Sequence, residues 1–357
     1  MNLPDWFGTV SDDPVCYRYS LKHAFGVLLL TLMMQLVTIS QARALQPVAW
    51  ASAHYQDHPL VGSLWNSEGD RTSWAALSAH LERSALIAIG EVHTNPDHHQ
   101  LQAAVLRHLT SAGRSPSVVW EMIPTIKQPI LQRWQESVRN AGNSSAASLG
   151  AQLEWSASGW PPWSDYQPIA EVARASGLSM QAAGLSRDWL RKIAGAGPDG
   201  LSDSLRAQYG LDLPLSSQQQ NSLLASLREG HCNLLPEQVL PGMQTVQRLR
   251  DGAMALKMAQ ADSPADAVLI AGNEHARKDR GVPWVLSQWH PVLSAVSIGQ
   301  LEVDPDLTDP RRLLQNAGLS GAFDYVIFTP RAEIKDHCAE LRKRFSRMPN
   351  QGKATDR

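Results

Sequence analysis

Residues 86–109, "LIAIGEVHTNPDHHQLQAAVLRHL", decide the fold because they combine a strand, a break and a helix in one short stretch. The apolar run ends at Gly90, after which Leu101, Val105 and Leu109 recur at helical spacing. An apolar run without polar alternation is typical of a strand that is covered on both faces of a parallel sheet. The stretch therefore predicts a β-strand followed directly by an amphipathic helix.

Similar runs recur along the chain and alternate with helical patterns. They cover residues 116–122, 177–185, 266–272, 292–299 and 324–330. This alternation predicts an α/β fold with a mainly parallel β-sheet flanked by helices. Between about 187 and 262 no strand-like run occurs, and this length exceeds an ordinary crossover between strands. We therefore expect a helical insertion subdomain that lies over the edge of the sheet or its strand ends.

The N-terminal segment resembles a secretory signal peptide. An apolar run from Ala24 to about Ile39 precedes Ala42-Arg43-Ala44, which is a cleavage site of the small-x-small type. The alternative is a membrane anchor, but the run is shorter than the ~20 residues that a spanning helix needs. We expect cleavage after Ala44 and a periplasmic or otherwise exported protein. The expected divisions are a signal peptide at 1–44, a lead-in hairpin and helix at 45–80, the α/β domain at 81–345 and a disordered tail at 346–357.

Charge and cysteine content narrow the classes of partner and compartment. The formal net charge is −2 and no basic stripe occurs, so a nucleic-acid partner is not expected. No cysteine follows the apolar run at the cleavage point, and lipid attachment there is not expected either. Cys232 and Cys338 lie beyond that point, and an oxidising compartment would permit them to pair, although two unpaired thiols remain the alternative.

Polar side chains gather where the predicted strands end. Glu91 and His93 follow the first strand, Glu121 ends the next, and His275 follows the strand at 266–272. Ligands of α/β sheets collect at the carboxyl ends of the strands, so these four groups are expected to converge in one crevice. Two imidazoles and two carboxylates would suit a divalent metal such as zinc or manganese. Taken singly, each histidine could be structural and Glu91 could cap the following helix.

Two of these junctions match each other. The sequences are "GEVH" at 90–93 and "GNEH" at 272–275, each directly after an apolar strand. Asn273 occupies the place of Glu91 in the second copy, so the two junctions are alike in outline but chemically unequal.

Several stretches together resemble a known family. They are "GEVHTNPDHHQLQAAVLRHL", "VVWEM", "GWPPWSDYQPI", "EGHCNLLPEQVLPGMQTVQRLRDGAMA" and "AGNEHARKDRGVPWVL". In this order, over roughly residues 58 to 300, the chain resembles the ChaN-like heme-binding uptake proteins of the wider superfamily of Tiki metalloproteases and erythromycin esterases. The superfamily pattern of G-E-x-H, a later Glu and G-x-x-H falls on Glu91, His93, Glu121 and His275.

The resemblance implies a heme-binding protein of bacterial iron acquisition, which could associate peripherally with the outer-membrane uptake system. Many members carry a lipid-acceptor cysteine, which this chain lacks. Heme needs an axial ligand and cations for its propionates. We expect Tyr209 or His231 as the axial ligand and Arg250 or Arg277 at the propionates, with heme between the strand-end crevice and the insertion. A slot open on one side would also favour a homodimer.

Two other functions remain open from the sequence. In a metal-dependent hydrolase, Glu91 or Glu121 would act as the base, and a metal held by His93 and His275 would activate water. In a pure binding protein the same groups would serve only as scaffolding. A cluster of aromatic residues in the loop expected at 153–169 would anchor that loop to the core or form a cavity wall.

Overall fold

The computed structural model of the protein describes residues 49–347, apart from 142–143, 261–265 and 293–294. The predicted signal peptide therefore lies outside the described residues, as does most of the predicted tail. Among the residues that are described, no helix is both long and apolar enough to span a membrane.

A seven-stranded sheet forms the centre of the fold, with the strand order β1-β7-β6-β2-β5-β3-β4. All neighbouring strands are parallel except β1, which pairs antiparallel with β7. The predicted α/β fold with a mainly parallel sheet is confirmed. The strands are β1 (Leu64–Asn66), β2 (Leu86–Glu91), β3 (Ser117–Pro124), β4 (Met180–Gly184), β5 (Ala267–Gly272), β6 (Ala295–Glu302) and β7 (Tyr325–Thr329).

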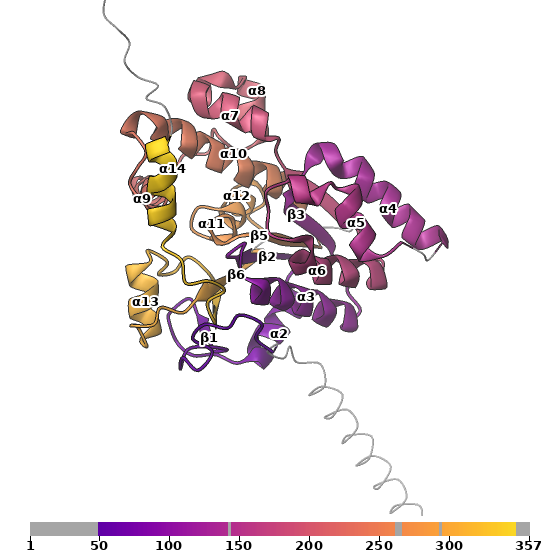
Figure 1. The fold of residues 1–357 in the computed structure, drawn as a ribbon. Coiled ribbons are helices and arrows are strands. Elements are labelled where there is room, and N and C mark those ends of the chain that lie inside the picture. Colours follow the sequence, from indigo (N-terminus) through magenta and orange to yellow (C-terminus); the bar gives the residue numbers. More distant parts are fainter. Residues whose placement is uncertain (1–48, 142–143, 261–265, 293–294, 348–357) are drawn as a thin grey trace, which may run out of the picture. The chain divides into compact units, whose positions relative to one another are not determined.

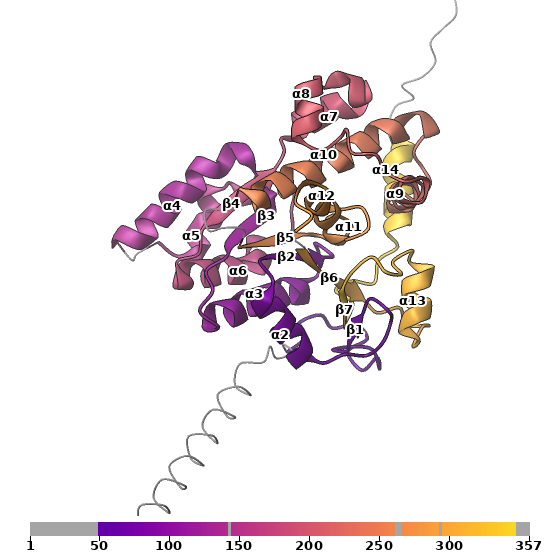
Figure 2. The same ribbon diagram turned by 180° about the vertical axis from the view of Figure 1, so that it is seen from behind.

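Helices cover both faces of the sheet, which explains why the strands are apolar throughout (Figures 1 and 2). On β2, Ile87 and Ile89 pack into one hydrophobic cluster, while Leu86 and Ala88 pack into another. Adjacent strand residues point to opposite faces, so each cluster lies on its own side of the sheet. The first face carries α2 (Trp74–Arg83), α3 (Pro96–Ser111), α4 (Gln128–Ala141), α5 (Ala146–Gln152) and α6 (Trp163–Ser176). The second carries α10 (Leu240–Ala259), α11 (Asn273–Ala276), α12 (Val282–Trp289) and α13 (Pro310–Asn316).

The expected helical insertion occupies the chain between β4 and β5. It consists of α7 (Arg187–Ala196), η3 (Gly197–Gly200), α8 (Asp203–Gln208), α9 (Ser217–Gly230), η4 (Glu237–Val239) and α10. A small hydrophobic cluster around Ile193, Leu201 and Leu249 holds α7 and α8 against α10. Cys232, just after α9, forms a disulfide with Cys338 at the start of α14 (His337–Arg347). Of the two alternatives that the sequence left open, the structure therefore shows the paired one.

The lead-in segment belongs to the same sheet, because β1 pairs with β7 from the far end of the chain. The lead-in segment contains a short hairpin: Trp65 and Arg71 form an antiparallel bridge, and the amides of Asn66 and Thr72 donate to the carbonyls of Asp70 and Leu64. α2 begins after Ser73, whose side chain accepts a hydrogen bond from the Ala76 amide. At the other end, α14 continues to Arg347 and so runs two residues into the predicted tail, which was expected to begin at 346.

The stretch expected as a loop at 153–169 is only partly a loop. η2 (Trp155–Ala157) is a short turn, but α6 begins at Trp163. Tyr166, Ile169 and Ala173 recur at helical spacing on the buried face of α6, which packs against α3. The prolines in this stretch favoured a loop, and burial of this apolar face outweighs Pro168 inside the helix.

Candidate functional site

Four polar residues meet where the strands β2, β3 and β5 end. Glu91 is the last residue of β2, His93 follows it, and His275 lies in the short helix α11 directly after β5. Glu121 was predicted to end its strand, but β3 continues to Pro124. Glu121 lies where β3 stops pairing with β5, because the pairing of these two strands ends at Trp120. Its carboxylate instead accepts a hydrogen bond from the Gly272 amide at 2.7 Å, which ties the two strand ends together.

The imidazole of His93 is oriented by Glu91. Their Nδ1 and Oε1 atoms lie 2.6 Å apart, so Nε2 points away towards Glu121, 3.7 Å from its Oε1 atom. Glu91 is buried and also accepts hydrogen bonds from the Tyr166 hydroxyl at 2.8 Å and the Gln102 amide at 2.7 Å. These donors fix the carboxylate, and the carboxylate in turn fixes the tautomer and the orientation of the imidazole.

The second imidazole is held in the same way by a residue that was not among the predicted site residues. Asp251 on α10 lies 2.6 Å from Nδ1 of His275, and the Nε2 atom lies 3.6 Å from Oε1 of Glu121. Both histidines therefore present Nε2 to one carboxylate oxygen. Arg250, the neighbour of Asp251, forms an ion pair with the same Glu121 oxygen.

Two glycines permit this crowding. A Cβ atom on Gly272 would lie 2.9 Å from Nε2 of His93, and one on Gly90 would lie 2.3 Å from the side-chain oxygen of Asn273. The glycine at each matched junction is thus required by close approach of the opposite junction.

The charges in the cluster shift one another's pKa values. Burial alone would raise the pKa of Glu121, but His275, Arg250 and His93 outweigh burial and lower it to about 2. Burial likewise opposes ionisation of Glu91, but His99 and His93 hold the pKa of that carboxyl well below its usual range. Burial lowers the pKa of His93, but Glu121 and Glu91 outweigh burial, so the net shift is upward. The cluster thus stabilises two ionised carboxylates in a buried place.

The structure does not show the predicted zinc or manganese site. Within the described ranges, no three His, Cys, Asp or Glu side chains are arranged to hold a metal ion. The physical reason lies in the partners, because Glu91 is saturated by His93, Tyr166 and Gln102, and Arg250 already supplies a positive charge to Glu121. A cation beside that guanidinium would be repelled.

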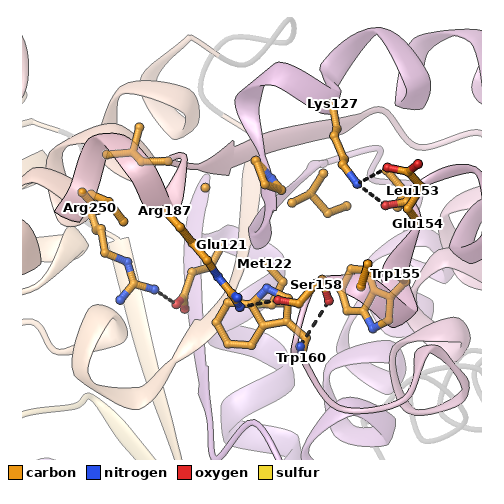
Figure 3. Close-up of a pocket in the computed structure, with 16 residues that line it drawn as sticks. Glu121, Met122, Lys127, Leu153, Glu154, Trp155, Ser158, Trp160, Arg187 and Arg250 are labelled. Atoms are coloured by element: carbon orange, nitrogen blue, oxygen red, sulfur yellow. Dashed lines mark hydrogen bonds and ion pairs between the residues drawn. The ribbon is translucent and has the colours of Figure 1, made fainter. Parts of the chain in front are cut away.

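A cavity of about 540 Å³ opens beside this cluster, between the ends of β3 and β4, the η2 segment and α7 (Figure 3). Its walls are mainly apolar and aromatic and include Trp155, Trp160, Leu185 and Leu190. Trp160 also packs against His93, with ring centroids 4.6 Å apart. The other lining residues are Glu121, Met122, Ile123, Pro124, Lys127, Leu153, Glu154, Ala157, Ser158, Gly184, Arg187 and Arg250.

The aromatic cluster of the sequence serves both expected roles. Trp155 and Tyr166 are buried in the core, and Trp155 and Trp160 also form the cavity wall.

Three of the predicted heme contacts lie outside the lining of this cavity. Tyr209 directly follows α8 and packs against Trp189, with ring centroids 6.1 Å apart. His231 directly follows α9, and its Nδ1 atom lies 2.8 Å from the Leu227 carbonyl oxygen. Arg277 is buried and paired with Asp279. Arg250 does line the cavity, but its guanidinium is already paired with Glu121.

Sequence reasoning missed Asp251, Gln102, Lys127 and Arg187. A signal for Asp251 was present, because an aspartate among apolar residues of a helix is costly to bury without a partner. Lys127 and Arg187 look like ordinary surface charges in the sequence, and only the folded chain places them at the cavity.

A family model described as "Haem-binding uptake, Tiki superfamily, ChaN" matches residues 77–286. Among solved structures, the chain is similar to ChaN of Campylobacter jejuni, described as showing cofacial heme binding. The identity is 20%, the alignment covers 74% of this chain and 95% of that one, and the TM-score is 0.56.

A mutant of an erythromycin esterase in its open conformation is also similar, at 14% identity over 77% of this chain and 99% of that one, with a TM-score of 0.40. A comparison with curated proteins gives no match. The family model spans more than half of the chain, and this chain therefore belongs to the ChaN family of haem-binding uptake proteins in the Tiki superfamily.

Proposed function

We propose that this protein binds heme as the cargo of bacterial iron uptake, in the cavity at the strand ends. The observation that carries the proposal is the cavity itself, whose size is typical of small-molecule sites and whose walls are apolar and aromatic. Trp155 and Trp160 offer flat surfaces to a porphyrin, and Leu185 and Leu190 exclude water. This composition fits a flat apolar ligand that carries a few polar groups.

His93 is the imidazole best placed to bind the iron. His93 does not itself line the cavity, but it lies against Trp160 and beside Glu121, both of which do. Its Nδ1 atom is committed to Glu91, so Nε2 is the atom available to a ligand. Hydrogen bonding to a carboxylate makes the ring a stronger donor, which is how second partners tune heme ligands. Tyr209 and His231 remain the alternative ligands that the sequence predicted.

Titration with hemin tests the proposal. The purified protein should give a saturable Soret band at one heme per chain, and Trp160→Ala should weaken binding because it removes a cavity wall. His93→Ala should shift the band, whereas Tyr209→Phe and His231→Ala should leave it in place. Failure of the native protein to bind hemin in a saturable way would refute the function. An unchanged band in His93→Ala, with a shifted band in either of the other two, would move the ligand to the insertion.

We also propose that the protein acts in an oxidising, exported compartment. The disulfide between Cys232 and Cys338 supports this, because such bonds persist outside the reducing cytosol. Mass spectrometry of the periplasmic fraction should find an N-terminus at Leu45. A retained N-terminus would identify the apolar run as an anchor instead.

Partners are part of the same proposal. A ligand that is exposed on one side favours pairing of two copies, so hemin should shift the protein towards a homodimer in size-exclusion chromatography with light scattering. Peripheral association with the outer-membrane uptake system is tested by co-sedimentation with outer-membrane vesicles. Recovery of the protein only in the soluble fraction would exclude that association.

Hydrolysis is a second candidate, and the paired imidazoles favour it. Each ring has a carboxylate at 2.6 Å from Nδ1 and presents Nε2 to the cluster, which is the arrangement of a general base. His93 is the more accessible of the two, with 28% of its side chain exposed. A panel of esters should be assayed with protein treated with a chelator, and His93→Gln should abolish any turnover. Absence of turnover above that of His93→Gln would exclude this candidate.

A further inference from the structure

Two cations line the cavity without a buried carboxylate to neutralise them. Lys127 is the last residue of η1 (Thr125–Lys127), and Arg187 is the first residue of α7. They approach the segment 153–160, which carries the two tryptophans of the cavity wall, at its beginning and near its end (Figure 3).

Backbone carbonyl oxygens are the main partners of both cations. Lys127 donates to the carbonyl of Leu153, and its Nζ atom lies 3.5 Å from the carboxylate of Glu154, which is 78% exposed. Arg187 donates to the carbonyl of Ser158. In the part of the chain that the structure describes, no carboxylate lies within ion-pair distance of Arg187. A neutral carbonyl compensates a full positive charge only partly, so both side chains keep the capacity to bind an anion.

The other candidate cations differ in this respect. Arg250 is paired with buried Glu121, and Arg277 with Asp279 and Glu274. A ligand carboxylate at either arginine would have to displace a protein carboxylate and leave it uncompensated, which is costly inside a protein. At Lys127 and Arg187 it would replace only a carbonyl oxygen.

The backbone at Gly159 makes room for the Arg187 side chain. Gly159 adopts a φ of +79°, and a Cβ atom there would lie 2.9 Å from Nη2 of Arg187. The absence of a side chain lets the guanidinium lie along the segment that ends at Trp160. The cation is therefore held at the edge of the aromatic wall.

We propose that Lys127 and Arg187 bind the two carboxylates of a flat, apolar dicarboxylate ligand, which are the two propionates of heme. The porphyrin would lie against Trp155 and Trp160, with its acidic edge towards the two cations. This inference rests on the proposed function and replaces Arg250 and Arg277 as the propionate contacts.

Comparison of hemin with its dimethyl ester tests the pairing, because methylation removes both negative charges and keeps the porphyrin and the iron. The native protein, Lys127→Met, Arg187→Met and the double variant are titrated with each ligand in the same detergent. Native protein should bind hemin at least tenfold more tightly than the ester. Each single variant should lose about tenfold in hemin affinity and little in ester affinity, since one charge-assisted contact is worth about that factor.

Controls separate this effect from general damage. Arg191→Met removes an exposed arginine of the same helix that does not line the cavity, and it should leave both affinities unchanged. Lys127→Arg keeps the charge and should preserve the preference for hemin. Circular dichroism and thermal unfolding check that each variant is folded.

The outcomes distinguish the inference from the function on which it rests. Tight binding of hemin with equal affinity for the ester, or a double variant that keeps the full preference, overturns the pairing and leaves heme binding intact. If native protein binds neither ligand, both the pairing and the proposed function are wrong.

Discussion

Histidines at the strand ends and in the helical insertion are held in different ways. His93 and His275 each have a carboxylate at 2.6 Å and share Glu121, so three elements of the sheet and α10 fix them. The described polar contact of His231 is to the Leu227 carbonyl, within its own helical turn. Contacts from several distant segments make a side chain rigid and preorganised. A side chain that is held only within its own helical turn is less constrained. This difference favours the strand ends as the functional site.

The largest expected effect comes from Glu121→Gln. The change removes the negative charge that Arg250, His93 and His275 share, and breaking a buried ion pair on one side costs about 3–5 kcal/mol. Urea unfolding at pH 7 measures the loss. Glu154→Gln, at a residue whose side chain is 78% exposed, is the control and should change stability by less than about 0.5 kcal/mol. Equal stability of the two variants would show that the cluster is not energetically coupled.

In the insertion, stability is expected to come from the cross-link. The disulfide between Cys232 and Cys338 closes a separation of 106 residues, and Cys338→Ser should cost about 2–4 kcal/mol because the unfolded chain gains freedom. Thermal unfolding of the variant and of protein treated with dithiothreitol should agree. A variant that melts at the native temperature would mean that α14 and α9 are held together by packing.

A lower pH should reduce the folding stability of the protein through protonation of His98 at the strand-end junction. Burial lowers the pKa of His98 from 6.5 to about 3, and its ring nitrogens are paired with the Val92 amide and the Thr329 hydroxyl. As the pH falls, His98 of the unfolded chain is protonated at a higher pH than His98 of the folded chain. The folding stability therefore falls as the pH drops from 6.5 towards 3. The slope from this residue is at most about 1.4 kcal/mol per pH unit.

His98→Gln should flatten this slope, and chemical unfolding at several pH values measures it. His231→Gln is the control in the insertion. An identical pH profile for the native protein and His98→Gln would contradict the assignment.

At the level of ligand binding, His93→Ala should lower hemin affinity by about tenfold, because the imidazole that would bind the iron is lost while the cavity walls remain. Glu91→Gln should weaken the bond less and raise the reduction potential of the bound heme, since the ring loses its anionic partner. Equilibrium titration and potentiometry measure the two effects. A potential that does not change in Glu91→Gln would show that His93 is not the ligand.

The smallest effects are expected in the insertion. His231→Ala and Tyr209→Phe should change hemin affinity by less than about twofold and stability by less than about 0.5 kcal/mol. The contacts described for these two residues, to the Leu227 carbonyl and to Trp189, lie outside the cavity lining. Loss of the Soret band in either variant would reverse the comparison and restore the binding mode predicted from the sequence.

Sequence patterns predicted the sheet because burial on both faces leaves a local signature. The runs at 86–91 and 267–272 are apolar at every position except near their ends, and strands form there as expected. Where the prediction was wrong, the competing signals were also local. Prolines at 161, 162 and 168 are local loop signals, but the apolar spacing of Tyr166 and Ile169 places the last seven residues of that stretch, 163–169, in α6.

The strand-end residues could be identified from the sequence for a topological reason. Parallel strands bring their carboxyl ends to one edge, so Glu91, His93, Glu121 and His275 could be brought together without knowing any helix packing. Their roles could not be predicted in the same way. Whether they hold a metal ion depends on Arg250 and Asp251, which arrive from α10 more than a hundred residues after Glu121.

The sequence by itself determined the alternation of buried strands with helices and the junctions that carry the polar groups. Only the tertiary structure decided which charges are neutralised, which histidine nitrogens are occupied, and that Trp155, Trp160, Lys127 and Arg187 share one cavity. The physical reason is the distance along the chain between the residues that interact. Burial patterns are set by neighbours along a strand or helix, whereas ion pairs and cavities arise from side chains that only packing between distant elements brings within a few ångströms.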